Sequence, residues 1–93
     1  MTYEEFLAID VERARSLAPA LAALALDRAG RWEAAHERAQ APETAETNRV
    51  HAYLHRKEGD AANARYWYRR VGEPFPTCSL DEEWQMLVHR YLG

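Results

Sequence analysis

Two histidines and a glutamate lie close together in the stretch HAYLHRKEGD, residues 51–60. His51 and His55 are four residues apart, and Glu58 follows three residues later. On a helix this spacing brings the three side chains to one face, where two imidazoles can bind the same metal ion or carry protons. Zinc needs at least a third protein ligand, and Glu58 or the more distant His36 could supply it.

Three interpretations of this histidine pair are compatible with the sequence. The first is a metal site, although the pair lacks the intervening glutamate of zinc proteases and has no cysteine nearby. The second is an acid/base or small-anion site, because histidine readily carries protons. In the third, both histidines are neutral, partly buried and hydrogen-bonded to Glu58, Asn63 or tyrosine hydroxyls.

The residues around this predicted helix separate into two arcs at about 100° per residue. His51 and His55 lie between Leu54 and Ala52, so they are expected to face the core. The opposite arc, which we call the cation face, is expected to point outward and contains Arg49, Tyr53, Arg56 and Lys57. Three cations around a tyrosine suit a carboxylate or an acidic peptide, through charge-assisted hydrogen bonds and cation–π contact. The alternative is an ordinary solvated face.

Helical periodicity runs along nearly the whole chain, and no segment alternates with period two. Capping boxes at Thr2–Glu5 and Ser79–Glu82, with further caps at Ser16 and Asp60, mark helix starts. The sequence predicts an all-α, compact bundle of about six helices in a single domain, residues 1–93. The expected helices cover residues 2–15, 17–29, 31–41, 43–58, 61–71 and 79–92.

Two of the predicted helix pairs resemble each other at a spacing of 29 residues. Helix pairs of this kind stack to form a continuous core. The repeat-like pairs cover about residues 17–41 and 43–76, and the helices at 2–15 and 79–92 are expected to cap the stack. The alignment matches Gly30 with Gly59, Ala35 with Ala64, and Ala39 with Tyr68.

The second pair resembles the tetratricopeptide repeat. The turn glycine, its following aspartate, the small packing residues, the aromatic and the closing proline of that repeat match Gly59, Asp60, Ala52, Ala64, Tyr68 and Pro76. In the first pair Gly30 and Ala35 match, but the proline comes early, at Pro42. The resemblance implies that the first helix of each pair lines a concave groove. The segments WEAAHERAQ and HAYLHRKEGDAANARYWYRRVGEP also resemble a group of short, uncharacterised bacterial helical-repeat proteins.

Composition limits the partners that we expect. The chain is 47% hydrophobic and 29% charged with a net charge of −3, as in a soluble globular protein. Its one cysteine, Cys78, cannot form an internal disulfide, and its acidic start is unlike a signal peptide, so we expect a cytoplasmic protein. The longest apolar run, residues 17–26, is about half a membrane span, so no membrane association is expected. The acidic net charge argues against nucleic acid. So does ARYWYRR, in which Trp67 and Tyr68 are expected to pack in the core and only Tyr66 is free to stack on a base.

No glycine-rich phosphate loop and no nucleophile elbow occur, so the sequence favours neither a cofactor nor an enzyme. We therefore expect a helical-repeat module that binds a protein or acidic peptide through the cation face, either as a monomer or as a homo-oligomer. The alternative is a small-ligand, metal or acid/base site built on His51, His55 and Glu58, with His36 as a further metal ligand.

Overall fold

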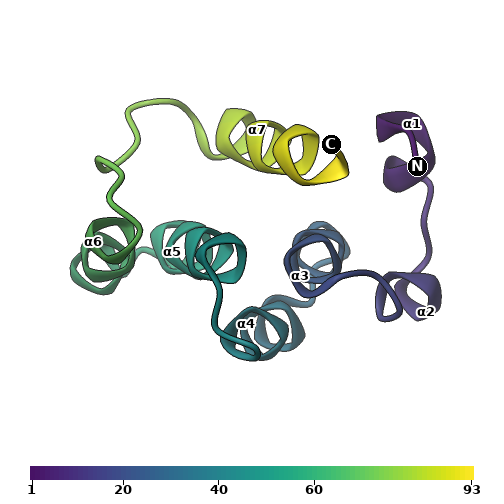
Figure 1. Ribbon diagram of the computed structural model, residues 1–93, viewed down its shortest axis with the longest axis horizontal. Helices are drawn as coiled ribbons and strands as arrows, with labels where there is room; N and C mark the ends of the chain where they lie inside the picture. Colours follow the sequence, from purple (N-terminus) through teal and green to yellow (C-terminus); the bar gives the residue numbers. More distant parts are fainter.

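Helical periodicity along the chain produces seven α-helices and no strands in the computed structural model, which describes residues 1–93 (Figure 1). The Cα radius of gyration is 12.1 Å, close to the ~12 Å expected for a compact domain of this length. The predicted all-α bundle is confirmed, with one helix more than expected. None of the helices combines the length and the apolar character that a membrane crossing would need. The helices are α1 (Tyr3–Leu7), α2 (Val11–Ala14), α3 (Pro19–Arg28), α4 (Trp32–Gln40), α5 (Ala45–Glu58), α6 (Ala61–Arg70) and α7 (Leu80–Leu92).

The predicted helix over residues 2–15 is wrong, because two short helices occupy this part of the chain. α1 begins as expected at the capping box of Thr2 and Glu5. The carboxylate of Asp10 then accepts a hydrogen bond of 2.8 Å from the backbone N–H of Arg13 and starts α2. An aspartate at this position competes with a continuous helix, because its carboxylate satisfies the free N–H groups of a new N-terminus.

The starts of two further helices also differ from the prediction. Ser16 does not cap α3, because its hydroxyl donates to a backbone oxygen three residues earlier. That helix begins at Pro19, a residue suited to a first turn. α5 begins two residues later than expected, since its capping residue is Thr44. The predicted caps Asp60 of α6 and Ser79 of α7 are confirmed.

Consecutive helices pack mainly in two pairs, α3 with α4 and α5 with α6. Both α3 and α4 also pack against α5, which joins the two pairs into one body. α7 packs on α3 and α5 on the side opposite α4, and α1 packs on α7 (Figure 1). α5 therefore has neighbours on several sides and lies at the centre of the bundle.

Both pairs turn at a glycine with a left-handed backbone, Gly30 (φ 80°) and Gly59 (φ 90°). Glycine adopts this conformation without the steric penalty of a Cβ atom. Ala35 and Ala64, each five residues after its glycine, have relative exposures of 0%, so the helices of each pair can approach closely. These positions agree with the 29-residue spacing of the sequence, while the tetratricopeptide-like arrangement itself stays a prediction.

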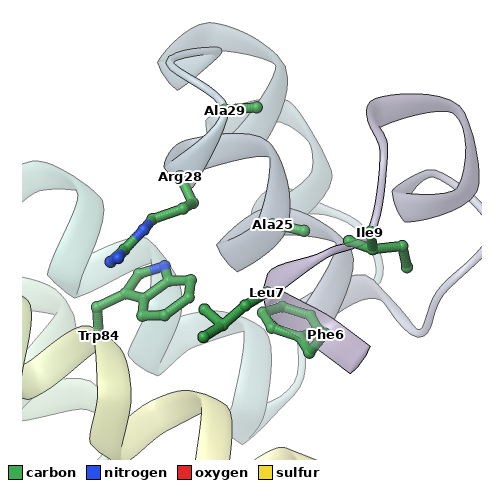
Figure 2. Close-up of a pocket in the computed structure, with 7 residues that line it drawn as sticks. All are labelled: Phe6, Leu7, Ile9, Ala25, Arg28, Ala29 and Trp84. Atoms are coloured by element: carbon green, nitrogen blue, oxygen red, sulfur yellow. The ribbon is translucent and has the colours of Figure 1, made fainter. Parts of the chain in front are cut away.

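The main core lies between α3, α5 and α7, and Trp84 of α7 is its largest buried side chain. The indole N–H of Trp84 donates to the backbone oxygen of Leu24, at 3.0 Å. The guanidinium carbon of Arg28 lies 4.5 Å from the indole ring centroid, so α7 is tied to α3 by packing, a hydrogen bond and a cation–π contact. Figure 2 shows Trp84 and Arg28 beside a small pocket of about 170 Å³. It is lined by Phe6, Leu7, Ile9, Ala25, Arg28, Ala29 and Trp84.

We expect Trp84→Ala to lower the free energy of unfolding by about 3–5 kcal/mol, because it removes a buried aromatic side chain and leaves a cavity. Urea unfolding followed by circular dichroism measures this change. Met86 lies on the same helix but is 64% exposed, so Met86→Ala is the matched control and should stay within about 0.5 kcal/mol of the wild type. Equal losses in the two variants would contradict the central role of Trp84.

Candidate functional site

Three histidines meet between α4 and α5. His51 and His55 lie on α5, and His36 of α4 reaches them from the other helix pair. The Nε2 atom of His36 lies 3.0 Å from Nε2 of His51 and 3.3 Å from Nε2 of His55. The expectation that His36 could approach the pair is confirmed by these distances. We call these three residues the histidine cluster.

The histidine cluster is mostly shielded from solvent. His51 and His55 are 4% and 6% exposed, which confirms that they face inward, and His36 is half-buried on the outer side. Trp32 of α4 stacks on His36 with ring centroids 4.9 Å apart, and Trp67 of α6 stacks on His51 at 4.2 Å. The two indoles therefore hold the imidazole rings in place.

The stacking of Trp32 and Trp67 on the histidines was not predicted. Trp67 was expected to pack in the core, and its contact with His51 joins α6 to the cluster. Trp32 precedes His36 by four residues, a helical spacing that places the two rings on one face. That spacing is the signal that could have identified Trp32 from the sequence.

The hydrogen-bond partners of His55 define its tautomer. Its Nδ1 atom lies 3.2 Å from Oε2 of Glu58, and an ionised carboxylate can only accept a hydrogen bond. Nδ1 therefore carries a proton, which leaves Nε2 as the nitrogen of His55 that faces the centre of the cluster and can bind a metal ion. Nδ1 of His51, in contrast, is buried and has no hydrogen-bond partner.

The contacts between the three rings depend on where their protons lie. If Nε2 of His55 is a lone pair, its contact with His36 uses a proton on Nε2 of His36. The same proton can be shared with a lone pair on Nε2 of His51, in a three-centre hydrogen bond. A metal ion at this centre would instead take one lone pair from each of the three rings.

Burial argues against an extra proton on His51. Removal from water, followed by the nearby His55 and His36, lowers the pKa of His51 to about 4. Burial also lowers the pKa of His36, and the proximity of His55 adds to that effect. Both rings are therefore neutral at pH 7 and present ligand-competent imidazoles.

The distances fit a transition-metal site. With Zn–N bonds of about 2.0–2.1 Å, two nitrogens of a tetrahedral site lie ~3.3 Å apart. The observed separations of 3.0 and 3.3 Å are close to this value, and one ligand atom from each histidine lies within 4.8 Å of the others. Three protein ligands leave a fourth position for water or an external ligand.

Most of the cation face, in contrast, is covered, so the expectation that it points outward is wrong for Arg49, Tyr53 and Arg56, while Lys57 is exposed. Tyr53 is only 3% exposed, and its hydroxyl donates to Oδ2 of Asp27 of α3 at 3.1 Å. Nζ of Lys57 donates to Oδ1 of the same carboxylate at 2.9 Å. Asp27 is itself buried, so its carboxylate holds both donors of α5 from within the protein, although the Lys57 side chain is 41% exposed.

The two arginines of the cation face are also paired. Arg56 donates to Oε1 of Glu83 on α7 at 2.7 Å and to the backbone oxygen of Cys78. Glu83 also accepts a hydrogen bond of 2.6 Å from the hydroxyl of Tyr68. Arg49 pairs with Glu73 in the loop before α7. The physical reason is that α3, α7 and the loop before α7 pack against α5 and bring their own carboxylates to the positions where an acidic partner was expected.

Comparison of the chain with protein-family models, with curated proteins and with solved structures found no match. The resemblance to the tetratricopeptide repeat therefore stays a prediction. The geometry of the histidine cluster is the observation that points to a function.

We expect the metal-free protein to lose stability as the pH falls from about 6.5 to about 4. An unfolded chain protonates His51 near pH 6.5 and the folded protein only near pH 4, so the unfolded state holds more protons within this window. His51 should then reduce the free energy of unfolding by up to about 1.4 kcal/mol per pH unit.

Urea unfolding in EDTA across this pH range measures the effect, with His51→Leu as the comparison. The leucine variant removes the titrating ring and should have a shallower pH slope. Equal slopes in the two proteins would contradict the low pKa of His51.

Proposed function

We propose that this protein binds a divalent transition-metal ion of the zinc class through His36, His51 and His55. The proposal is carried by the convergence of three Nε2 atoms at distances that suit one ion. A metal ion would accept one lone pair from each of the three rings, whereas the shared proton of the metal-free cluster occupies one of the three nitrogens. Imidazole ligands suit zinc, copper and nickel, and imidazole sites bind copper most tightly along the first-row series.

A bound ion would connect the two helix pairs, because its ligands come from both α4 and α5. It would stabilise the folded state by the free energy of binding. A ligand set of three neutral imidazoles also leaves a net charge of +2 at the ion. The fourth coordination position would therefore favour water, hydroxide or an anionic ligand.

The peptide-binding module that the sequence suggests is a second proposal. It is supported by the equivalent buried alanines Ala35 and Ala64 of two tetratricopeptide-like pairs. An acidic peptide on the cation face would have to displace Asp27 and Glu83, which are both buried and hydrogen-bonded. For this reason we prefer the histidine cluster as the functional site.

Zinc titration of the metal-free protein, prepared without a polyhistidine tag, tests the first proposal. At a free zinc concentration a hundredfold above Kd, binding should stabilise the wild type by about 2.7 kcal/mol. We expect His36→Ala to abolish this gain, because it removes the ligand that bridges the two helices. Thermal unfolding with and without zinc, together with isothermal titration, measures the effect.

The chain provides a matched control in its fourth histidine. His89 lies on α7, is exposed and stacks on Tyr3, away from the cluster. His89→Ala should therefore keep the full zinc response. An unchanged midpoint in the wild type, or an equal zinc response in the His36→Ala variant, would refute metal binding at this site.

A further inference from the structure

Glu58 bonds to the outer nitrogen of one histidine of the cluster. Its Oε2 atom lies 3.2 Å from Nδ1 of His55, and the two residues are three positions apart on the last turns of α5. The helix itself therefore sets the contact. The His55 side chain is 8% exposed and that of Glu58 is 36% exposed, so the carboxylate lies at the border between the cluster and solvent.

Glu58 is placed to act through His55 and not as a ligand of the same ion. The two nitrogens of an imidazole point away from each other, so a carboxylate on the Nδ1 side is on the far side of the ring from the ion held by Nε2. The sequence-based interpretation of Glu58 as a third metal ligand is therefore replaced by His36 as the third ligand and Glu58 as the residue behind His55.

The two histidines of α5 differ in what their outer nitrogens contact. Nδ1 of His55 bonds to a carboxylate, whereas Nδ1 of His51 is buried without a partner. A carboxylate at this position fixes the tautomer and the ring orientation. It also makes Nε2 more basic, so that Nε2 donates its electron pair more strongly to a metal ion. It also brings a negative charge to a site whose three ligands are neutral.

The neighbouring acidic residue Asp60 has a different role. One of its oxygens lies within 4.8 Å of ligand atoms of His55 and Glu58. Its carboxylate, however, accepts a hydrogen bond from the backbone N–H of Asn63 and caps α6. Glu58 is thus the acidic residue whose hydrogen bond reaches the histidine cluster.

We propose that Glu58 is a positioning residue that sets the metal affinity of the histidine cluster by holding His55 in the Nδ1–H tautomer. This inference rests on the proposed metal-binding function. Outer-shell carboxylates of this kind typically change metal affinity by about 10–100-fold. Glu58→Ala should therefore weaken zinc binding by this factor, and Glu58→Gln, which keeps an acceptor but loses the charge, should weaken it less.

Competition between the full-length protein and a chromophoric chelator for zinc gives Kd for each variant. Glu37→Ala is the matched control, because Glu37 is an exposed acidic residue next to His36 that forms no hydrogen bond with the cluster. If the effect comes from the hydrogen bond to His55, the control should change Kd much less than Glu58→Ala does. Equal changes in the two variants would overturn the proposal in favour of a general charge effect.

A second measurement does not depend on zinc. Nitrogen-15 NMR of the histidine side chains in the metal-free protein reports the tautomer of His55, which should be Nδ1–H in the wild type and mixed in Glu58→Ala. An unchanged tautomer, or an unchanged Kd in a wild type that does bind zinc, would overturn the role of Glu58 and leave metal binding intact. Absence of zinc binding in the wild type, with the tautomer change present, would overturn the metal site itself and the affinity role with it.

Discussion

The structure depends on the burial of α5, a helix whose sequence is polar but which has neighbours on several sides. Eight of its fourteen residues are buried, and they include two histidines, an asparagine, a threonine and a tyrosine. Polar groups removed from water cost free energy unless they find partners inside the protein. The surrounding helices therefore have to supply hydrogen-bond partners as well as apolar surface, and the two sides of α5 receive them in different ways.

On the side of α3 and α7 the partners are carboxylates, and they match the donors of α5. Asp27 accepts from both Tyr53 and Lys57, and Glu83 accepts from Arg56 as well as from Tyr68. On the side of α4 and α6 the partners are other histidines and tryptophan rings. This side is not fully matched, because Glu58 bonds only to the outer nitrogen of His55 and Nδ1 of His51 is buried without a partner. The contrast between a matched and an unmatched side of one helix is the physical basis for placing the functional site at the histidines.

The features that depend on local sequence could be predicted, and those that depend on distant helices could not. The capping boxes at Thr2 and Ser79 and the inward direction of the histidines follow from neighbouring residues and helical periodicity. A helical wheel also separates the cation face correctly from the histidine face. It cannot tell whether a polar face meets water or another helix, and Glu83, beside the core residue Trp84, carries no local sign that it will pair with Arg56. The approach of His36 was predictable only as a candidate, since its distance to α5 depends on how α4 packs.

The position of the histidine cluster also limits what a metal ion could do for the fold. The largest core cluster, with Trp84, Leu24 and Leu54, lies mainly on the side of α3 and α7 and does not contain the histidines. A small zinc domain without such a core unfolds when the metal is removed, because the ion supplies most of its folding free energy. Here apolar burial and the internal ion pairs hold α3, α5 and α7 together independently of the cluster. Metal binding would therefore adjust the stability and the mutual position of α4 and α5 in a protein that is already folded, and it would leave the fourth coordination position open to an external ligand.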